Sequence, residues 1–207
     1  MGSQEDENGP GGRCGVVYER WISADGTAPG RIVRHDGVRP PSRTWNGDTA
    51  GLTKEKDCYQ GVVDEVSEKP APGGSWTEPT RGFVAGLPTD PRALYERAAA
   101  DIARDGQQLT KEQGIFNYFS DLLLSGSPHL TPALKSAVYR AMALVPGVRD
   151  LGTATDLLGR QGVAVAGPED GDDRTILDPA TGELLGESGG YEVARTYAVV
   201  NDTASRP

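Results

Sequence analysis

The sequence predicts an α+β fold in which three central helices pack on a curved, half-barrel-like antiparallel sheet. β-rich segments open the chain, amphipathic segments with helix-capping residues occupy its centre, and short strands separated by turns close it. Because strands and helices do not alternate, a doubly wound parallel sheet is disfavoured. We expect strands from both sides of the central helices to join in one bent sheet.

The first part of the chain predicts a short leader and a hairpin. Residues 1–14 are polar, acidic and glycine-rich, which is typical of a disordered segment, and residues 15–207 are expected to form a single α+β domain. The runs at 15–23 (GVVYERWIS) and 31–35 (RIVRH) are expected to pair as two strands. From about 36 to 86 proline and glycine interrupt the chain, so we expect a mobile excursion in which only residues 60–66 are mildly apolar.

The centre predicts three amphipathic helices. Two of them begin with a capping residue followed by proline at the first helical position, at Asp90-Pro91 and Thr131-Pro132. The remaining helix is expected over residues 111–124, and Gly106 is a natural stop for the first. Apolar residues recur at helical spacing within the three segments: Leu94, Ala98 and Ile102; Ile115, Phe116, Phe119, Leu122 and Leu123; Leu134, Val138, Met142 and Val145.

The final third predicts short antiparallel strands. They are expected at residues 154–159, 161–166, 174–178, 183–187 and 191–200. Residues 178–182 (DPATG) are a strong hairpin turn, since aspartate, proline and glycine each favour turn geometry.

Charge and hydropathy exclude two classes of partner. The net charge of −9 repels a phosphate backbone, so we expect no nucleic-acid partner. No stretch approaches the roughly 18 apolar residues that span a bilayer, so we expect no membrane insertion by this chain.

No catalytic, metal or cofactor motif is present. The only histidines are His35 and His129, and no G-x-S-x-G nucleophile elbow accompanies them. The acidic run at 169–173 lacks the spacing of a calcium-binding EF-hand loop, and the glycine-rich segments lack the lysine of a phosphate-binding loop. We therefore expect no catalytic residues, no metal and no cofactor.

Aromatic residues provide the one functional cluster that the sequence suggests. An apolar ligand pocket is expected from Trp21, Phe116, Phe119, Tyr139 and Tyr197. The competing interpretation is that these side chains only fill the core.

The two cysteines, Cys14 and Cys58, are an even pair and are expected to form a disulfide. The bond closes a loop of about 45 residues, worth ~3–4 kcal/mol on the chain-entropy account. The alternative is two thiols in a reducing cytosol.

Five segments in this order resemble a known family: 19–26 (ERWISADG), 86–94 (GLPTDPRAL), 134–148 (LKSAVYRAMALVPGV), 156–166 (DLLGRQGVAVA) and 178–187 (DPATGELLGE). The chain is similar to the C-terminal part of uncharacterised actinobacterial proteins that are membrane-anchored, extracytoplasmic and often encoded near sigma factors. The resemblance implies an outward-facing domain behind one membrane helix, and it carries over no catalytic residues. This chain departs from the pattern in having no membrane helix and in its shortened first strands. If Met1 is the native start, the resemblance allows a cytoplasmic relative instead.

Three functions follow as hypotheses. The first is an extracytoplasmic binding or sensing domain without catalytic activity, with a small apolar molecule or a partner protein as ligand. The alternative is a cyclase-like enzyme that shapes a pocket around a small hydrophobic substrate of a secondary-metabolite pathway. The third is an interaction module that uses its helical face.

Overall fold

The computed structural model describes residues 16–21, 30–39, 53–54, 59–66, 73–106, 109–156, 158–171, 173–188 and 192–194. The helices in these ranges are α1 (Arg81–Ala85), α2 (Pro91–Asp105), α3 (Lys111–Ser125) and α4 (Pro132–Met142), with a 3-10 turn over Ser127–His129. The paired strands are all antiparallel. The predicted α+β class is therefore confirmed.

The described strands lie in three sheets. The first sheet has the order β1 (Val16–Trp21), β2 (Arg31–Asp36) and β5 (Val62–Val66). A separate two-stranded sheet pairs β3 (Val38–Arg39) with β4 (Thr53–Lys54). The second sheet has five strands in the order β10, β9, β8, β7, β6. Their bounds are β6 (Arg149–Thr155), β7 (Gln161–Ala166), β8 (Arg174–Leu177), β9 (Leu184–Ser188) and β10 (Glu192–Ala194).

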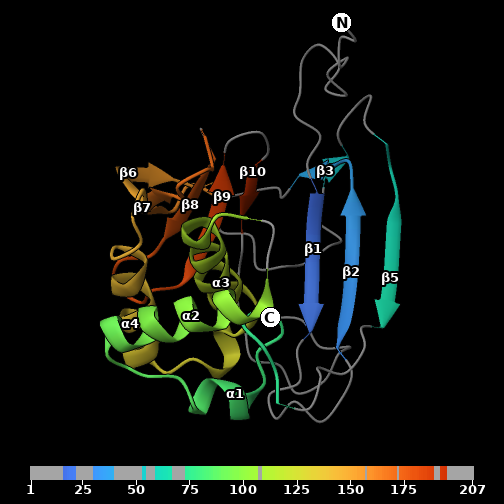
Figure 1. Cartoon of the computed structure of the whole chain (residues 1–207). Coiled ribbons are helices and arrows are strands. Elements are labelled where there is room, and N and C mark those ends of the chain that lie inside the picture. The colour runs from blue at the N-terminus through green and yellow to red at the C-terminus, as the bar shows by residue number, and fades with distance from the viewer. Residues whose placement is uncertain are drawn as a thin grey trace, which may run out of the picture.

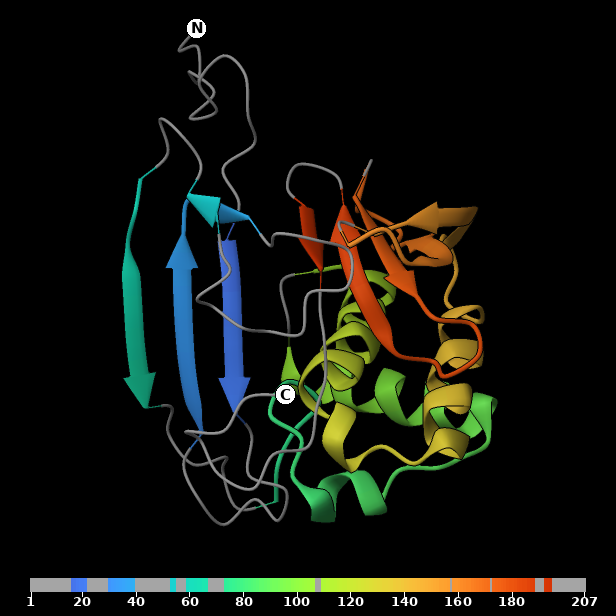
Figure 2. The ribbon, with the colours of Figure 1, turned by 180° about the vertical axis from the view of Figure 1, so that it is seen from behind.

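Strands from before and after the helices do not join in one sheet, which differs from the expectation. Both views show the β1–β2–β5 sheet standing beside the helices and the second sheet (Figures 1 and 2). The predicted first hairpin does form, with Val16 opposite Asp36 and Trp21 opposite Arg31. Its third strand is β5, from the segment expected to be irregular. Each sheet thus pairs strands that are close in sequence, which keeps the entropy of loop closure small.

The central helices begin and end where capping chemistry predicts. The side chains of Asp90, Thr110 and Thr131 each accept a hydrogen bond from the backbone N–H three residues further on, at the first turns of α2, α3 and α4. Gly106 ends α2 in the left-handed conformation, at φ +63°. Thr110 was not singled out from the sequence, although it supplies the same cap.

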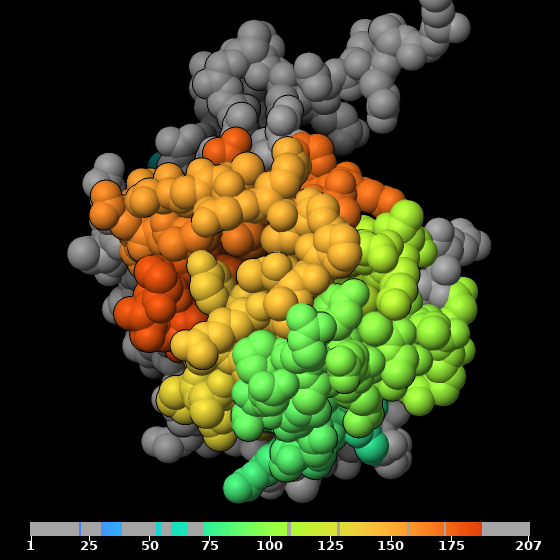
Figure 3. Space-filling view, turned by 60° about the vertical axis from the view of Figure 1, so that its left-hand side comes forward, coloured from blue at the N-terminus to red at the C-terminus, as the bar shows by residue number. Residues whose placement is uncertain are grey.

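One apolar core joins the three long helices to one face of the second sheet. The strands contribute Val165, Leu177 and Leu184, all buried. Alternate residues Ala164, Ile176 and Leu185 form a separate buried cluster on the opposite face. In the space-filling view the helical segments (green to yellow) lie directly against the C-terminal strands (orange) (Figure 3).

The strand expected at residues 154–159 begins and ends earlier, at Arg149–Thr155. The reason is Asp156, whose Oδ1 accepts the backbone N–H of Arg160 and whose Oδ2 accepts the Arg160 Nε, each at 2.7 Å. These bonds close a turn in which Gly159 takes φ +78°. The chain at Leu158 and Gly159 is thus a turn rather than a continued strand.

The turn predicted at residues 178–182 forms between β8 and β9. The N–H of Ala180 donates to Asp178 Oδ1 at 2.8 Å, and this bond, chief among several, lowers the pKa of Asp178. Lys135 of α4 then pairs with Glu183 at 3.0 Å. The hairpin is thereby fixed against α4.

Candidate functional site

A glutamine clamp fixes the turn after β7 to the first turn of α3. The buried Gln113 donates from Nε2 to Asp170 Oδ1 at 2.7 Å, and its Oε1 accepts the Glu169 N–H at 2.8 Å. Asp170 Oδ2 also accepts the Gly167 N–H at 2.7 Å. A Cβ on Gly167 would lie only 2.7 Å from Phe116 Cδ1, so only glycine allows this close approach.

A groove opens beside this clamp, between α3 and the place where β8 begins and β9 ends. Its volume is about 250 Å³ and it is open to solvent. The part of α3 that lines it is one face of the helix, because the lining residues there are spaced one and four apart. They are Phe116, Asn117, Ser120 and Asp121. Thr175 and Glu187 are opposite each other in the β8–β9 register and line the other side. The full lining is Phe116, Asn117, Ser120, Asp121, Asp170, Asp173, Arg174, Thr175 and Glu187.

The chemistry of the groove is polar and negative. Four carboxylates and one guanidinium line it, together with hydroxyl and amide groups. The hydroxyl oxygen of Ser120 is buried and makes no hydrogen bond within the part of the chain that the structure describes. Such a lining suits a cationic or hydrogen-bonding group better than an apolar one.

The acidic run at 169–173, weighed as a calcium site from the sequence, has a different role at Asp170. Both oxygens of that carboxylate accept hydrogen bonds from Gln113 and Gly167. Among the described residues, no group of three or more His, Cys, Asp and Glu is placed to hold a metal ion.

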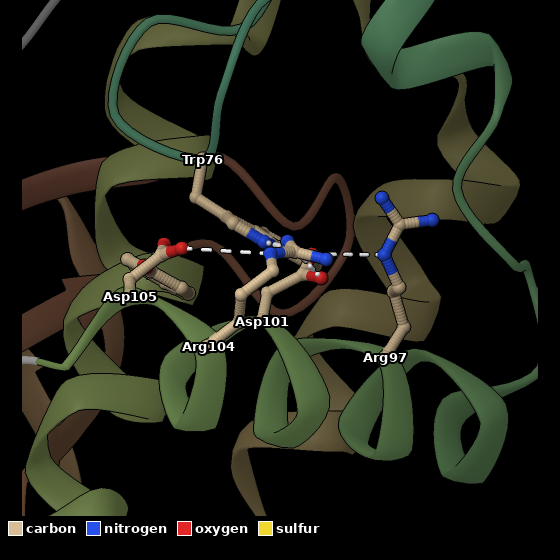
Figure 4. Close-up of polar contacts among 6 residues, drawn as sticks. Trp76, Arg97, Asp101, Arg104 and Asp105 are labelled. Carbon is tan, nitrogen blue, oxygen red and sulfur yellow. Dashed lines mark hydrogen bonds and ion pairs between the residues drawn. The ribbon is translucent and has the colours of Figure 1, made fainter.

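Another polar cluster surrounds the buried side chain of Trp76 (Figure 4). Trp76 precedes α1 and is 3% exposed. Its indole N–H donates to Asp101 Oδ2 at 2.9 Å. Its ring stacks on Tyr118, with centroids 5.5 Å apart, and meets Phe83 and Phe119 edge-on.

Asp101 is a buried carboxylate on α2 that two arginines of the same helix neutralise. Arg97 donates to Oδ2 at 2.8 Å and Arg104 to Oδ1 at 2.7 Å. Burial acts to raise the pKa of Asp101, but the hydrogen bonds from Arg97, Trp76 and Arg104 and the charge of Arg97 hold it below its usual value. Both oxygens of Asp101 are thus engaged. The Trp76 bond to Oδ2 fixes the segment before α1 to α2, and the two arginine bonds neutralise the carboxylate within α2, which is a structural role.

The residues predicted to line an apolar pocket come from different parts of the fold. Phe119 is fully buried in the core, and Tyr139 of α4 lies partly exposed against the same core. Phe116 belongs to the core and also lines the polar groove. Trp21 lies on β1 of the other sheet, with Arg31 5.1 Å above its ring. Tyr197, Cys14 and Cys58 lie outside the described residues.

His129 lies at the end of the 3-10 turn. Burial, together with the charge of Arg81, lowers its pKa. It does not line the groove, so it adds no acid or base to the candidate site.

No helix within the described residues is both long enough and apolar enough to cross a bilayer. Comparison with family models, with curated proteins and with solved structures finds no match for this chain.

Proposed function

We propose that this chain is a non-catalytic binding domain whose α3 groove receives a cationic side chain of a partner protein. The observation that carries the proposal is the lining of the groove, in which four carboxylates face one arginine around a polar hollow. The buried hydroxyl of Ser120 supports it, because a buried donor without a partner is costly unless a ligand satisfies it.

The size of the groove favours a side chain over a whole small molecule. Small-molecule sites usually enclose about 300–1,000 Å³. The groove is smaller, at about 250 Å³, and it is open rather than enclosed. An arginine or lysine side chain has the matching size and charge.

The cyclase-like alternative requires an enclosed apolar pocket. The groove is open and mostly polar, and Phe119 of the expected pocket is fully buried among core residues. The geometry therefore favours binding of a polar partner group over both an apolar ligand and a hydrophobic substrate.

The location that we propose is extracytoplasmic, as the family resemblance implies. An oxidising compartment permits a Cys14–Cys58 disulfide. Titration of the denatured, non-reduced protein with a thiol reagent is expected to find no free thiol. Two reactive thiols in protein isolated from its native cell would contradict this location.

Binding at the groove is testable with a short peptide. We expect an end-capped pentapeptide with one arginine between glycines to shift the amide NMR signals of Asn117, Ser120 and Thr175 saturably. The double substitution Asp173→Asn/Glu187→Gln is expected to weaken this binding about fivefold, because each partly exposed charge contact is worth ~0.2–1 kcal/mol.

A charge-matched variant controls for the field of the whole protein. Glu78→Gln/Glu96→Gln removes the same two charges from exposed positions outside the groove and is expected to leave the affinity within twofold. Equal losses in the two variants, or equal binding of the same peptide with glutamate in place of arginine, would remove the groove as the site.

A further inference from the structure

The first sheet ends in an edge strand, β5, that differs from the edge strand β6 of the second sheet. In both views β5 is the outermost strand, on the side away from the helices (Figures 1 and 2). It pairs with β2 in continuous register from Arg31 opposite Val66 to His35 opposite Val62, without a bulge. A straight, regular edge is a template for a further strand.

The ladder fixes which backbone groups of β5 face outward. The Asp36 N–H donates to the Gly61 carbonyl at 2.9 Å, so this pair is hydrogen-bonded to β2. Because hydrogen-bonded and non-bonded pairs alternate in an antiparallel ladder, Val63 and Glu65 also bond to β2. Val62 and Asp64 therefore direct their N–H and C=O groups away from the sheet.

The outward-facing residues are accessible. Val62 is 68% exposed, and the Asp64 side chain is 51% exposed. Tyr59, just before the strand, is 78% exposed. Large apolar side chains beside a row of outward backbone groups match the requirements of strand addition, in which main-chain bonds give affinity and side chains give specificity.

The edge strand β6 of the second sheet is blunted in a way that β5 is not. A bulge interrupts β6 between Asp150 and Gly152. Gly152 there takes φ +77°, and its N–H donates to Asp150 Oδ1 at 2.8 Å. The bulge twists the strand and occupies one backbone donor, which disfavours pairing with another chain.

We propose that the β5 edge accepts an extended segment of a partner protein that carries two adjacent basic residues. Asp64 and Glu65 lie on opposite faces of β5, so neighbouring lysines or arginines on an added strand lie beside each of them. The carboxylate of Asp64 already pairs with Arg31 of β2 at 2.7 Å, so the basic residue on that face shares a half-exposed carboxylate, whereas the one beside Glu65 gains the larger part of the charge contact. A second copy of this chain would instead bring a net charge of −9, its own Asp64 and Glu65 included. Charge complementarity thus selects a basic partner segment over self-association.

A proline substitution tests the edge without breaking the sheet. Val62→Pro removes an outward N–H and leaves the bonds to β2 intact. The probe is an end-capped hexapeptide, Thr-Val-Lys-Lys-Val-Thr, added to the full chain. We expect it to slow hydrogen exchange at the amides of Val62 and Asp64, and we expect Val62→Pro to weaken its binding about fivefold, the value of the one hydrogen bond that the missing N–H would donate.

Matched variants and peptides separate the outcomes. Val62→Thr keeps the N–H and is expected to bind within twofold of the parent, and the peptide with two glutamates is expected to bind about tenfold more weakly. Unchanged hexapeptide binding by a folded Val62→Pro protein overturns the proposal that the β5 edge is the binding site. If sedimentation shows that the parent protein self-associates and that Val62→Pro abolishes this self-association, the occupant of the edge is a second copy of the chain and not a basic partner segment. Asp173→Asn/Glu187→Gln is expected to leave hexapeptide binding unchanged, so failure at the groove is distinguishable from failure at β5.

Discussion

Replacing Trp76 with alanine is expected to lower the free energy of unfolding by about 3–5 kcal/mol, as for other large aromatic side chains removed from a core. Trp76 packs on three aromatic rings and donates a hydrogen bond to the buried Asp101. Since domains are stable by only about 5–15 kcal/mol, this is a large share of the total. Urea unfolding followed by circular dichroism measures the loss.

Two further tryptophan variants separate packing from hydrogen bonding. Trp76→Phe keeps a ring in the core but loses the indole N–H, and we expect it to lose about 1.5–3 kcal/mol, the value of a hydrogen bond to a charged group. Trp21→Ala removes a partly exposed ring that lies outside this core and is expected to lose no more than ~2 kcal/mol. A Trp21→Ala loss equal to that of Trp76→Ala would contradict the central position of Trp76.

Local chemistry made the helices predictable. Asp90 before Pro91 and Thr131 before Pro132 satisfy backbone donors within their own first turns. Asp178 does the same in the turn between β8 and β9. Each of these bonds joins residues two or three apart, so the sequence alone contains the whole interaction.

The core around Trp76 was not predictable in the same way. Proline and glycine on both sides of Trp76 suggested an irregular excursion, whereas the side chain is buried against helices from later in the chain. One local signal was available. Asp101 interrupts the apolar stripe of Leu94, Ala98 and Ile102, with arginines four residues before it and three after it. A carboxylate in such a stripe with two adjacent guanidinium groups indicates a buried, neutralised charge.

The division of the strands into separate sheets depends on contacts between distant segments, and so does the formation of the groove. The sequence predicts β2 as a strand but places β5 in an irregular segment, and nothing local to either indicates that they pair with each other. The groove requires the register that places Thr175 opposite Glu187 and the clamp from Gln113 to Asp170. These partners are 12 and 57 residues apart, so no local pattern contains them.

The contribution of Asp101 to stability is expected to depend on pH. Its pKa in the folded protein is lowered, so the folded state favours the ionised carboxylate more than the unfolded state does. The stabilisation is therefore present above the unfolded pKa of about 3.9 and is lost as pH falls through the lower, folded pKa. Asp101→Asn is expected to lose about 2 kcal/mol at pH 7, because Arg97 and Arg104 are partly exposed and water replaces part of each contact. Urea titrations of both proteins from pH 7 downward measure this difference.

The direction of the pH effect distinguishes an ionised Asp101 from a carboxyl that is merely well packed. Asparagine resembles the protonated acid, so the difference in stability between the two proteins is expected to shrink as pH falls below about 3.9 and to be smallest below the lowered, folded pKa, where the folded parent is itself protonated. Glu96→Gln, an exposed substitution on the same helix, is expected to change stability by less than about 0.5 kcal/mol at any pH. A difference between the parent and Asp101→Asn that stays constant down to pH 3 would mean that folding does not lower the pKa of Asp101. In that case the arginine bonds would do no more than offset the burial of the charge, and the attachment of Trp76 to α2 would depend on packing and on the indole hydrogen bond.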